Sequence, residues 1–159
     1  MDGTVKQILG VKGFDVAMVE PQTSLKRCAQ IMKDNGIGSL LVVDNDELKG
    51  ILHERDICRR AVSHGLDVDL TVVEQIMDTE FATVTLSTTV MEAMAIISEH
   101  RVRHLPVIDS GELVGVISIG DVTKWVLDLQ EEDLHQLVSY ILGSTERLSI
   151  AKLNRAVGE

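Results

Sequence analysis

The sequence predicts an α/β protein made of two β-α-β-β-α repeats that pack about a pseudo-twofold axis, followed by a C-terminal helical extension. Two observations predict this architecture. Residues 16–62 match residues 81–127 without a gap when the chain is shifted by 65 positions, and eleven aligned residues are identical. In both copies, short apolar stretches typical of strands also alternate with segments whose apolar residues recur at helical spacing. Only 3 % of the residues are aromatic, so aliphatic side chains must build the core.

Each repeat is expected to begin with a short strand and an amphipathic helix. The strands fall at 16–19 and 82–84, and a threonine follows each of them, Thr23 or Thr88. A threonine hydroxyl can accept a hydrogen bond from a free amide of the first helical turn, so both are predicted N-caps. Apolar residues then recur at i, i+3, i+4 and i+7, which predicts one buried face per helix. These stripes are Leu25, Cys28, Ala29 and Met32, and Val90, Ala93, Met94 and Ile97.

A hairpin and a second helix complete each repeat. Continuous apolar runs predict buried strands, and pairs of turn residues separate them from the strands that return. The strands are expected at 40–43 and 48–52 around Asn45-Asp46, and at 105–108 and 113–117 around Ser110-Gly111. The second helices are expected to start near Asp56 and Asp121.

Three residues add local constraints. Gly36 is expected to end its helix in the left-handed conformation, where the second repeat has Arg101. Pro106 implies a strand that lies at an edge or bends toward a cleft. Neither repeat is long enough to bury its own sheet face well, so the copies are expected to pack on each other and to form two related clefts.

Four regions follow from the repeat. They are an N-terminal segment (1–15), the first repeat (16–65), the second repeat with its linker (66–127) and the C-terminal extension (128–159). The extension carries an apolar helical stripe opposite acidic residues, which is typical of a helix that packs on its own body or on a partner subunit. The stripe comprises Leu134, Leu137, Val138 and Ile141. Self-association is therefore the first interpretation of this region.

Composition and charge exclude several classes of protein. The formal net charge of −10 argues against binding to nucleic acid or to an anionic membrane through a broad basic face. No basic stretch followed by an apolar run opens the chain, and nowhere do eighteen apolar residues run together, so neither a secretory signal nor a membrane span is expected. The two cysteines make no disulfide framework, which favours a cytoplasmic protein.

The clearest candidate site lies at the strand-to-helix junction of the second repeat, at Ser118 and Asp121. A carboxylate in this place can accept hydrogen bonds from the two hydroxyls of a ribose, as acidic residues do in dinucleotide folds. A hydroxyl and free helix amides can hold phosphate oxygens. The same Ser-x-x-Asp pattern is also a capping box, and from the residues alone capping is the commoner explanation.

In the first repeat, His53 and Asp56 occupy the same register. The serine of the capping box is missing here although the aspartate remains, which favours a ligand over helix geometry as the reason for Asp56. Arg55 offers a planar cation suited to phosphate, with a solvated arginine as the alternative.

A third candidate is the basic run 100–106, which contains Arg103 and His104 in an otherwise acidic protein. It suits a phosphate, or it neutralises nearby carboxylates. Its counterpart in the first repeat contains Gly38 and Ser39 and no cation, so the two clefts are expected to differ. One should suit anions well and the other poorly.

Enzymatic function has little support in the sequence. The histidines and Cys58 show no pairing typical of a metal site, and Cys28 lies on an apolar stripe, which favours a core position. Phosphate-binding, dinucleotide-binding and nucleophile-elbow motifs are absent from the sequence. We therefore expect no catalytic residues, no metal and no catalytic cofactor.

The duplicated unit, with His-Leu-Pro-Val-Ile-Asp at 104–109 and Gly-Val-Ile-Ser-Ile-Gly-Asp at 115–121, closely resembles the cystathionine-β-synthase (CBS) repeat family. The resemblance covers about residues 5–127, and the extension is similar to that of small bacterial CBS-pair proteins. Two such repeats form a Bateman module. The resemblance implies that adenosine derivatives such as AMP, ADP, ATP, NAD(H) or S-adenosylmethionine bind between the repeats, and that two modules stack into a dimer.

The resemblance also implies two sites, each with an aspartate from one repeat and strands from the other. The first, here called the Asp56 cleft, would combine Asp56, Arg55 and His53 with Ala82, Thr83, Val84, Arg103, His104 and Pro106. The second, the Asp121 cleft, would combine Ser118 and Asp121 with Ala17, Met18, Val19, Gly38 and Ser39. Because its cations are more numerous, the Asp56 cleft is the first place where we expect a nucleotide.

The expected function is a regulatory module that senses an adenine nucleotide and signals in trans to an effector protein. The alternative is a ligand-independent dimeric scaffold that uses its acidic helical extension for interaction. An enzyme is the third hypothesis, because no nucleophile–base pair or metal set is recognisable.

Overall fold

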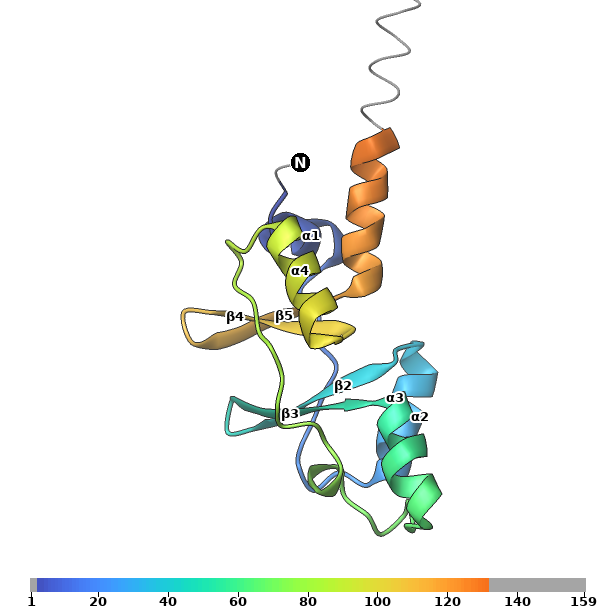
Figure 1. The fold of residues 1–159 in the computed structure, drawn as a ribbon. Coiled ribbons are helices and arrows are strands. Elements are labelled where there is room, and N and C mark those ends of the chain that lie inside the picture. The colour runs from blue at the N-terminus through green and yellow to red at the C-terminus, as the bar shows by residue number, and fades with distance from the viewer. Residues whose placement is uncertain (1–2, 132–159) are drawn as a thin grey trace, which may run out of the picture. The chain divides into compact units, whose positions relative to one another are not determined.

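The computed structural model describes residues 3–131, so the predicted stripe at 134–141 lies outside the described residues. The chain divides into two compact units, Asp2–Val122 and the remainder from Thr123, and each is described by itself. The larger unit holds both repeats (Figure 1). In the smaller unit the described residues, 123–131, are helical. No helix in the described part of the chain is long and apolar enough to cross a membrane.

The first repeat forms a three-stranded sheet with two helical segments. Its sheet has the order β1 (Met18–Val19), β2 (Ser39–Asp44) and β3 (Glu47–His53), with β1 parallel and β3 antiparallel to β2. Helix α2 (Leu25–Asn35) connects β1 to β2. After β3 the chain enters α3 (Glu54–Asp56) and continues through a π-helical turn (Ile57–Ala61) and a 3-10 turn (Val62–His64).

The second repeat follows the same order with a smaller sheet. Helix α4 (Val90–His100) precedes the antiparallel pair β4 (His104–Asp109) and β5 (Glu112–Ser118), and residues 119–131 are helical. The strand predicted at 82–84 is reduced to one parallel bridge, in which Val84 donates to the carbonyl of Pro106 at 3.0 Å. Pro106 therefore faces the sparsely paired edge of β4, where its missing amide costs least, and the predicted edge position is confirmed.

The helix caps differ from the prediction by one residue in each repeat. Ser24 caps α2 by accepting from the amide of Arg27, and Thr89 caps α4 in a full capping box with Glu92. The predicted caps Thr23 and Thr88 were wrong. The hydroxyl of Thr88 instead accepts from the amide of Thr85 in the preceding turn. The predicted left-handed end of α2 at Gly36 is confirmed, with φ of 63°.

Each repeat is completed by the segment that precedes the other repeat. Helix α1 (Val5–Lys12), inside the predicted N-terminal segment, packs on β5 of the second repeat. The short 3-10 turn Val73–Gln75 leads instead to Asp78, which pairs with Ile51 on β3 of the first repeat. This exchange joins the two repeats into one unit, as the repeat packing predicted.

Two equivalent glycines permit these close approaches. A Cβ on Gly115 would lie 2.7 Å from Cδ1 of Leu9 in α1, and a Cβ on Gly50 would lie 2.6 Å from the sulfur of Met77. The shared glycine of the two repeats thus marks the place where the exchanged segment crosses the sheet. The fully buried side chains of Leu40, Leu52, Leu105 and Ile117 form the aliphatic interior beside it.

Candidate functional site

Four side chains at the open ends of the two hairpins define the interface between the repeats. The strand registers pair Ser39 with His53 and His104 with Ser118. Repeat symmetry relates Ser39 to His104 and His53 to Ser118, so each hairpin carries one serine and one imidazole. The rings of His53 and His104 approach each other across the interface, with centroids 5.4 Å apart.

A cavity of about 290 Å³ lies in the Asp121 cleft. It brings together Ala17, Gly38, Ser39 and Ser118, as the sequence predicted for this site. Two members of the predicted set lie elsewhere: Met18 is half exposed on β1 and Val19 belongs to the hydrophobic core. The complete lining consists of Lys12, Asp15, Ala17, Gly36, Ile37, Gly38, Ser39, Leu41, His104, Val116 and Ser118.

Asp121 lies directly behind this lining and is held in a fixed orientation. Its Oδ2 accepts from the amide and the hydroxyl of Ser118, both at 2.7 Å, and from Nζ of Lys12 at 2.6 Å. Burial by itself would raise the pKa of Asp121, but the hydrogen bonds from Lys12 and Ser118 outweigh it and hold the pKa below its usual value. Asp121 is therefore an ionised acceptor at neutral pH.

The capping and ligand hypotheses for Ser118 and Asp121 are compatible. The amide of Asp121 donates a hydrogen bond to the Ser118 hydroxyl at 3.2 Å, so the predicted capping box is present. The Asp121 side chain nevertheless keeps 23 % of its surface exposed. The capping box thus orients a carboxylate that remains accessible.

Sequence reasoning missed Lys12 and Asp15, which both line the cavity. They lie outside the duplicated region, on the segment that the second repeat receives from the N-terminus. Lys12 is the last residue of α1 and also donates to the carbonyl of Val116 at 3.0 Å. The repeat pattern offers no signal for Lys12, because the residue aligned with it is Met77.

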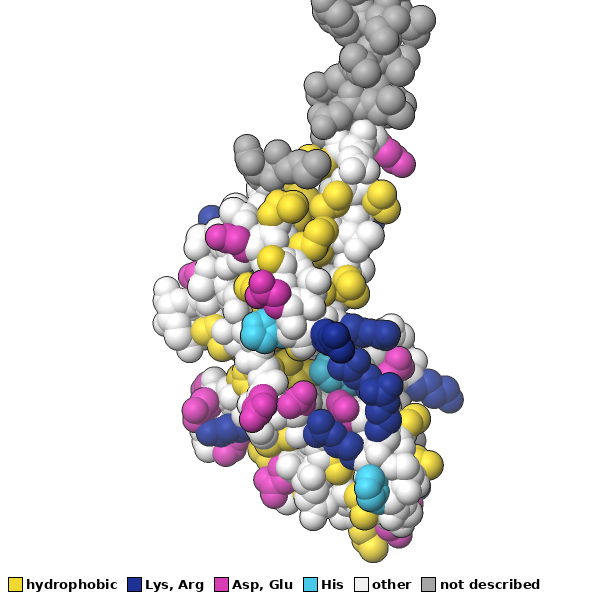
Figure 2. Space-filling view, in the orientation of Figure 1, with side chains coloured by type: hydrophobic (Ala, Val, Ile, Leu, Met, Phe, Trp, Pro, Cys, Tyr) yellow, Lys and Arg dark blue, Asp and Glu magenta, His cyan; other side chains and the backbone are white. Residues whose placement is uncertain are grey.

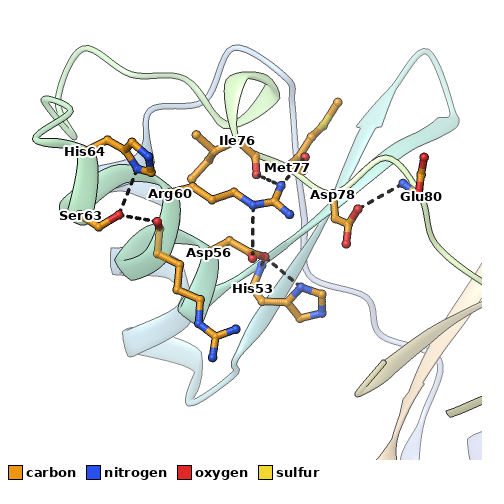
Figure 3. A network of polar contacts seen from close by, with 10 residues as sticks. His53, Asp56, Arg60, Ser63, His64, Ile76, Met77, Asp78 and Glu80 are labelled. Carbon is orange, nitrogen blue, oxygen red and sulfur yellow. Dashed lines mark hydrogen bonds and ion pairs between the residues drawn. The ribbon is translucent and has the colours of Figure 1, made fainter. Parts of the chain in front are cut away.

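The Asp56 cleft is arranged differently, as Figure 3 shows. His53 and Asp56 are each only 7 % exposed. Oδ2 of Asp56 accepts from the amide of His53 at 3.0 Å and lies 3.1 Å from its Nδ1. Asp56 thus accepts from the amide at the start of the helix without the serine, so helix geometry explains this aspartate and the preference for a ligand over helix geometry was wrong.

Arg60 is a second partner of Asp56 that sequence reasoning missed. Its Nε lies 3.8 Å from Oδ1 of Asp56, and its Nη1 donates to the carbonyl of Ile76 at 2.9 Å. The guanidinium therefore links the second helical segment of the first repeat to the exchanged segment before the second repeat (Figure 3). Arg55, the predicted phosphate ligand, is partly exposed and belongs to the same short helix as Asp56.

The remaining predicted members of the Asp56 cleft span the range from exposed to buried. Arg103 and Thr83 are exposed, Ala82 and His104 are partly buried, and Val84 and Pro106 are buried. Burial, followed by the charges of His53 and Lys12, lowers the pKa of His104 to about 4. Both Nε2 of His53 and Nδ1 of His104 are buried without a hydrogen-bond partner among the described residues. His104 is therefore a neutral ring that borders both clefts.

Cations gather on the side of the Asp56 cleft, as the sequence predicted. Figure 2 shows Lys and Arg side chains in a band beside a histidine, on a face that is otherwise mixed. At least partly exposed arginines from this half of the interface are Arg55, Arg59, Arg60, Arg101 and Arg103. Their repeat equivalents are Gly120, Lys124, Trp125, Gly36 and Gly38. The charge of the two clefts is therefore unequal.

The cysteines support no catalytic interpretation. Cys28 is fully buried in the core, and burial raises the pKa of its thiol to about 11. The exposed Cys58 lies in a separate hollow between the two helical segments of the first repeat. Within residues 3–131 no three His, Cys, Asp or Glu side chains are grouped to hold a metal ion.

Comparison with known proteins identifies the class to which this fold and cleft belong. The family model described as CBS domain matches the chain twice, at residues 11–63 and 73–128. The chain therefore belongs to the CBS-domain family and contains a tandem pair of its repeats, which confirms the resemblance. The second match begins at residue 73, before the strand predicted at 82–84, and therefore includes the exchanged segment that starts at Val73.

Relatives and solved structures agree with this assignment. CBS domain-containing protein YhcV of Bacillus subtilis is 34 % identical over 107 residues, 67 % of this chain and 76 % of the relative. The mitochondrial CBS domain-containing protein CBSX3 of Arabidopsis thaliana is 38 % identical over 117 residues, 70 % of this chain but only 57 % of the relative. The structure of a putative signal-transduction protein with CBS domains from Burkholderia ambifaria is 41 % identical, with a TM-score of 0.76 over 79 % of this chain and 94 % of that one.

Proposed function

We propose that this CBS pair is a cytoplasmic regulatory module that binds an adenine nucleotide in the Asp121 cleft and signals to a partner protein. The observation that carries the proposal is the cavity between the repeats, where Ala17, Gly38, Ser39 and Ser118 meet in front of an ionised Asp121. CBS modules generally bind adenine nucleotides, and this arrangement supplies a polar end and an apolar wall for such a ligand.

Each part of the cleft has a proposed role. The carboxylate of Asp121 accepts from the ribose hydroxyls. Ala17, beside β1, and Gly38 leave room for the flat adenine, and Ile37 and Val116 supply apolar contact. The hydroxyls of Ser39 and Ser118 donate to ring nitrogens or phosphate oxygens. Predicted members Met18 and Val19 support the wall from behind through β1.

The cavity volume limits what the cleft can enclose. Small-molecule sites span about 300–1,000 Å³, and the cavity of about 290 Å³ lies at the lower end of this range. It suits one nucleoside, with phosphates directed outward. AMP, ADP and ATP fit this description better than NAD(H), whose second nucleoside would remain outside. We therefore propose a mononucleotide as the ligand.

The Asp56 cleft becomes the second choice for a nucleotide. Arg55 and Arg103 suit phosphate, and Val84, Ala82, Thr83 and Pro106 suit adenine by the family pattern. However, His53 and Asp56 are nearly buried, and the His53 ring lies against His104. A nucleoside would have to displace these rings, which costs free energy that the Asp121 cleft does not require. The greater number of cations is thus outweighed by the lack of room.

Thermal unfolding with adenosine, AMP, ATP, NADH and S-adenosylmethionine tests the proposal. A ligand that binds only the native state stabilises it by about 2.7 kcal/mol at a hundred times its Kd, which raises the Tm by several degrees. We expect AMP or ATP to raise the Tm, and Asp121→Ala to remove most of that rise. Asp56→Ala is the matched control at the equivalent position, and we expect it to keep the ligand-induced rise even if it lowers the Tm itself.

The same experiment tests the remaining hypotheses. If no ligand shifts the Tm at millimolar concentration, the ligand-independent dimeric scaffold replaces the sensor, and sedimentation of the ligand-free protein should then show a dimer. If a nucleotide is steadily converted to product, the protein is an enzyme and the regulatory proposal is wrong. If Asp56→Ala alone removes the rise in Tm, the nucleotide occupies the Asp56 cleft.

A further inference from the structure

Lys12 contacts Asp121 at the edge of the cavity. Lys12 lines the cavity, whereas Asp121 itself is not part of the lining. The ammonium of Lys12 lies 2.6 Å from Oδ2 of Asp121 and 3.0 Å from the carbonyl of Val116. The ammonium of Lys12 therefore lies between the cavity and one oxygen of the ribose acceptor, whose side chain keeps 23 % of its surface exposed.

All side-chain hydrogen bonds of Asp121 within the described residues end on the same oxygen, Oδ2. Ser118 fixes that oxygen through its amide and its hydroxyl, and both donors come from the strand end that orients the carboxylate. Lys12 is the one donor that comes from outside the repeat. Oδ1 is left to accept from one ribose hydroxyl. A second hydroxyl that bonds Oδ2 competes with Lys12 and leaves Ser118 in place.

Lys12 is built to move in this way. It is the last residue of α1, and Gly13 follows with φ of 102°, a conformation that ends the helix. Its side chain keeps 35 % of its surface exposed, and its four-carbon stem turns freely at low cost. When a ribose takes the carboxylate, the ammonium can turn toward the mouth of the cavity without rearrangement of the fold.

The charges around the cavity make the Lys12 ammonium necessary for binding a phosphate. Asp15 also lines the cavity, so two carboxylates, Asp15 and Asp121, border a site proposed to take an anion. His104 is neutral at physiological pH because its pKa is lowered to about 4. Lys12 is the only lysine or arginine that lines the cavity in the described part of the chain. Without its charge the site would repel phosphate.

We propose that Lys12 is a charge-selective latch that covers the ribose-binding carboxylate in the cleft and passes to the phosphate when a nucleotide binds. The proposal rests on the proposed function and names a specificity residue for it. Adenosine replaces the Lys12–Asp121 ion pair with ribose hydroxyls but leaves the displaced ammonium without an anionic partner, whereas AMP gives that ammonium a phosphate contact. The latch therefore makes the protein select phosphorylated nucleosides over adenosine.

Calorimetric titration of adenosine and AMP into wild type, Lys12→Met and Lys12→Arg tests the latch. A charge-assisted hydrogen bond corresponds to about a tenfold change in affinity or more. We expect Lys12→Met to weaken AMP binding by about tenfold and to leave adenosine binding equal or tighter. Lys12→Arg should retain the preference for AMP. Lys6→Met, which removes an exposed lysine of the same helix, is the charge-matched control and should behave like wild type.

The outcomes separate the latch from the proposed function. If wild type binds AMP but Lys12→Met weakens AMP and adenosine by the same factor, Lys12 only supports the fold and the latch is wrong. If Lys6→Met reproduces the effect of Lys12→Met, the cause is net charge rather than the contact, and the latch is again wrong. If wild type binds neither ligand, the proposed function is wrong, and the latch is wrong as well because it rests on that function.

Discussion

The Asp56 and Asp121 clefts are two versions of one construction, and they differ in side-chain type at two repeat positions next to the interface. The repeat-equivalent pairs are Ser39 with His104 and Ser118 with His53. Both serines and His104 border the cavity of the Asp121 cleft, whereas His53 is almost fully buried with its ring 5.4 Å from that of His104. Duplication supplies the same strand register in both sites, and the volume of the side chains at the two equivalent positions differs between them.

The two aspartates show the same contrast in their partners. Asp56 is held by His53 and Arg60 from its own repeat, whereas Asp121 is held by Ser118 and by Lys12 from the exchanged helix. Asp56 therefore stabilises a closed arrangement of local contacts. Asp121 is bound by a group from another segment, which a ligand can replace.

Replacing Ser118 by histidine, the residue at the equivalent position of the first repeat, gives the largest expected effect on AMP binding. Ser118→His would place an imidazole in the cavity, and overfilling a packed site costs about 1–3 kcal/mol. We expect AMP binding to fall about ten- to hundredfold in calorimetric titration. Ser118→Ala removes the hydroxyl without adding volume and should lose much less, which distinguishes filling of the cavity from loss of the capping box.

The reciprocal change, His53→Ser, sharpens the comparison from the other side. It removes the ring that packs on His104 and gives the Asp56 cleft the Ser-x-x-Asp pattern of its counterpart. We expect the number of AMP molecules bound per chain to rise from one to two. A stoichiometry of one in both proteins would mean that the four hairpin-end residues do not explain the difference between the clefts.

Gly50 and Gly115 occupy equivalent positions in the two repeats, and we expect their substitution to lower stability by unequal amounts. A Cβ on Gly50 would lie 2.9 Å from the backbone oxygen of Asp78 as well as against Met77, whereas a Cβ on Gly115 meets only the side chain of Leu9. Flexible side chains move more easily than a hydrogen-bonded backbone. We expect Gly50→Ala to lower the free energy of unfolding by about 2–3 kcal/mol and Gly115→Ala by about 1 kcal/mol, measured with urea. Equal losses would contradict this.

The neutral His104 makes stability depend on pH. Its pKa is about 4 in the folded protein, against 6.5 for an unperturbed histidine. The unfolded chain therefore binds more protons between these values, so stability falls as the pH decreases from 6.5 to 4. His53, Lys12 and Arg103 add to this effect, and Asp121 opposes it. Because the ring is partly exposed, we expect a loss of about 1–2 kcal/mol.

Comparison of pH profiles isolates this contribution. His104→Ser introduces the residue found at the equivalent position of the first repeat, and it should show a smaller loss of stability between pH 6.5 and 4 than wild type. His100→Ser, at an exposed position, is the control and should retain the wild-type slope. Parallel profiles for all three proteins would show that His104 is not the group responsible.

The repeat made most of the fold predictable from the sequence, and the family resemblance pointed to Ala17, Gly38, Ser39 and Ser118, which the structure places around one cavity. Apolar periodicity placed α2, β2, β3, α4, β4 and β5, because these elements bury one regular face each. Lys12 and Asp15 were not predictable, because they reach the second repeat only through the exchange of segments. The room in each cleft was not predictable either, since it depends on how the imidazoles pack across the interface.

Local hydrogen bonding was a further limit of the sequence. A threonine next to a second hydroxyl offers two possible caps, and the sequence alone placed them at Thr23 and Thr88. The structure places them one residue later because the preceding residue takes part in the turn that leads into the helix: the amide of Thr23 donates to the carbonyl of Glu20, and the hydroxyl of Thr88 accepts from Thr85.

Removing the helix caps gives the smallest expected effect on stability. Ser24 and Thr89 occupy equivalent positions, so their substitution again compares the two repeats. The hydroxyl of Thr89 accepts from the amide of Glu92, and the amide of Thr89 donates to the Glu92 carboxylate. The bonds from the Thr89 amide and hydroxyl to that carboxylate lower the pKa of Glu92. Ser24 makes only the first kind of bond, at 3.3 Å. We expect Thr89→Ala to cost about 1 kcal/mol of unfolding free energy and Ser24→Ala less than that. Thr23→Ala should cost least, and a larger loss there than at Ser24 would restore the cap that the sequence predicted.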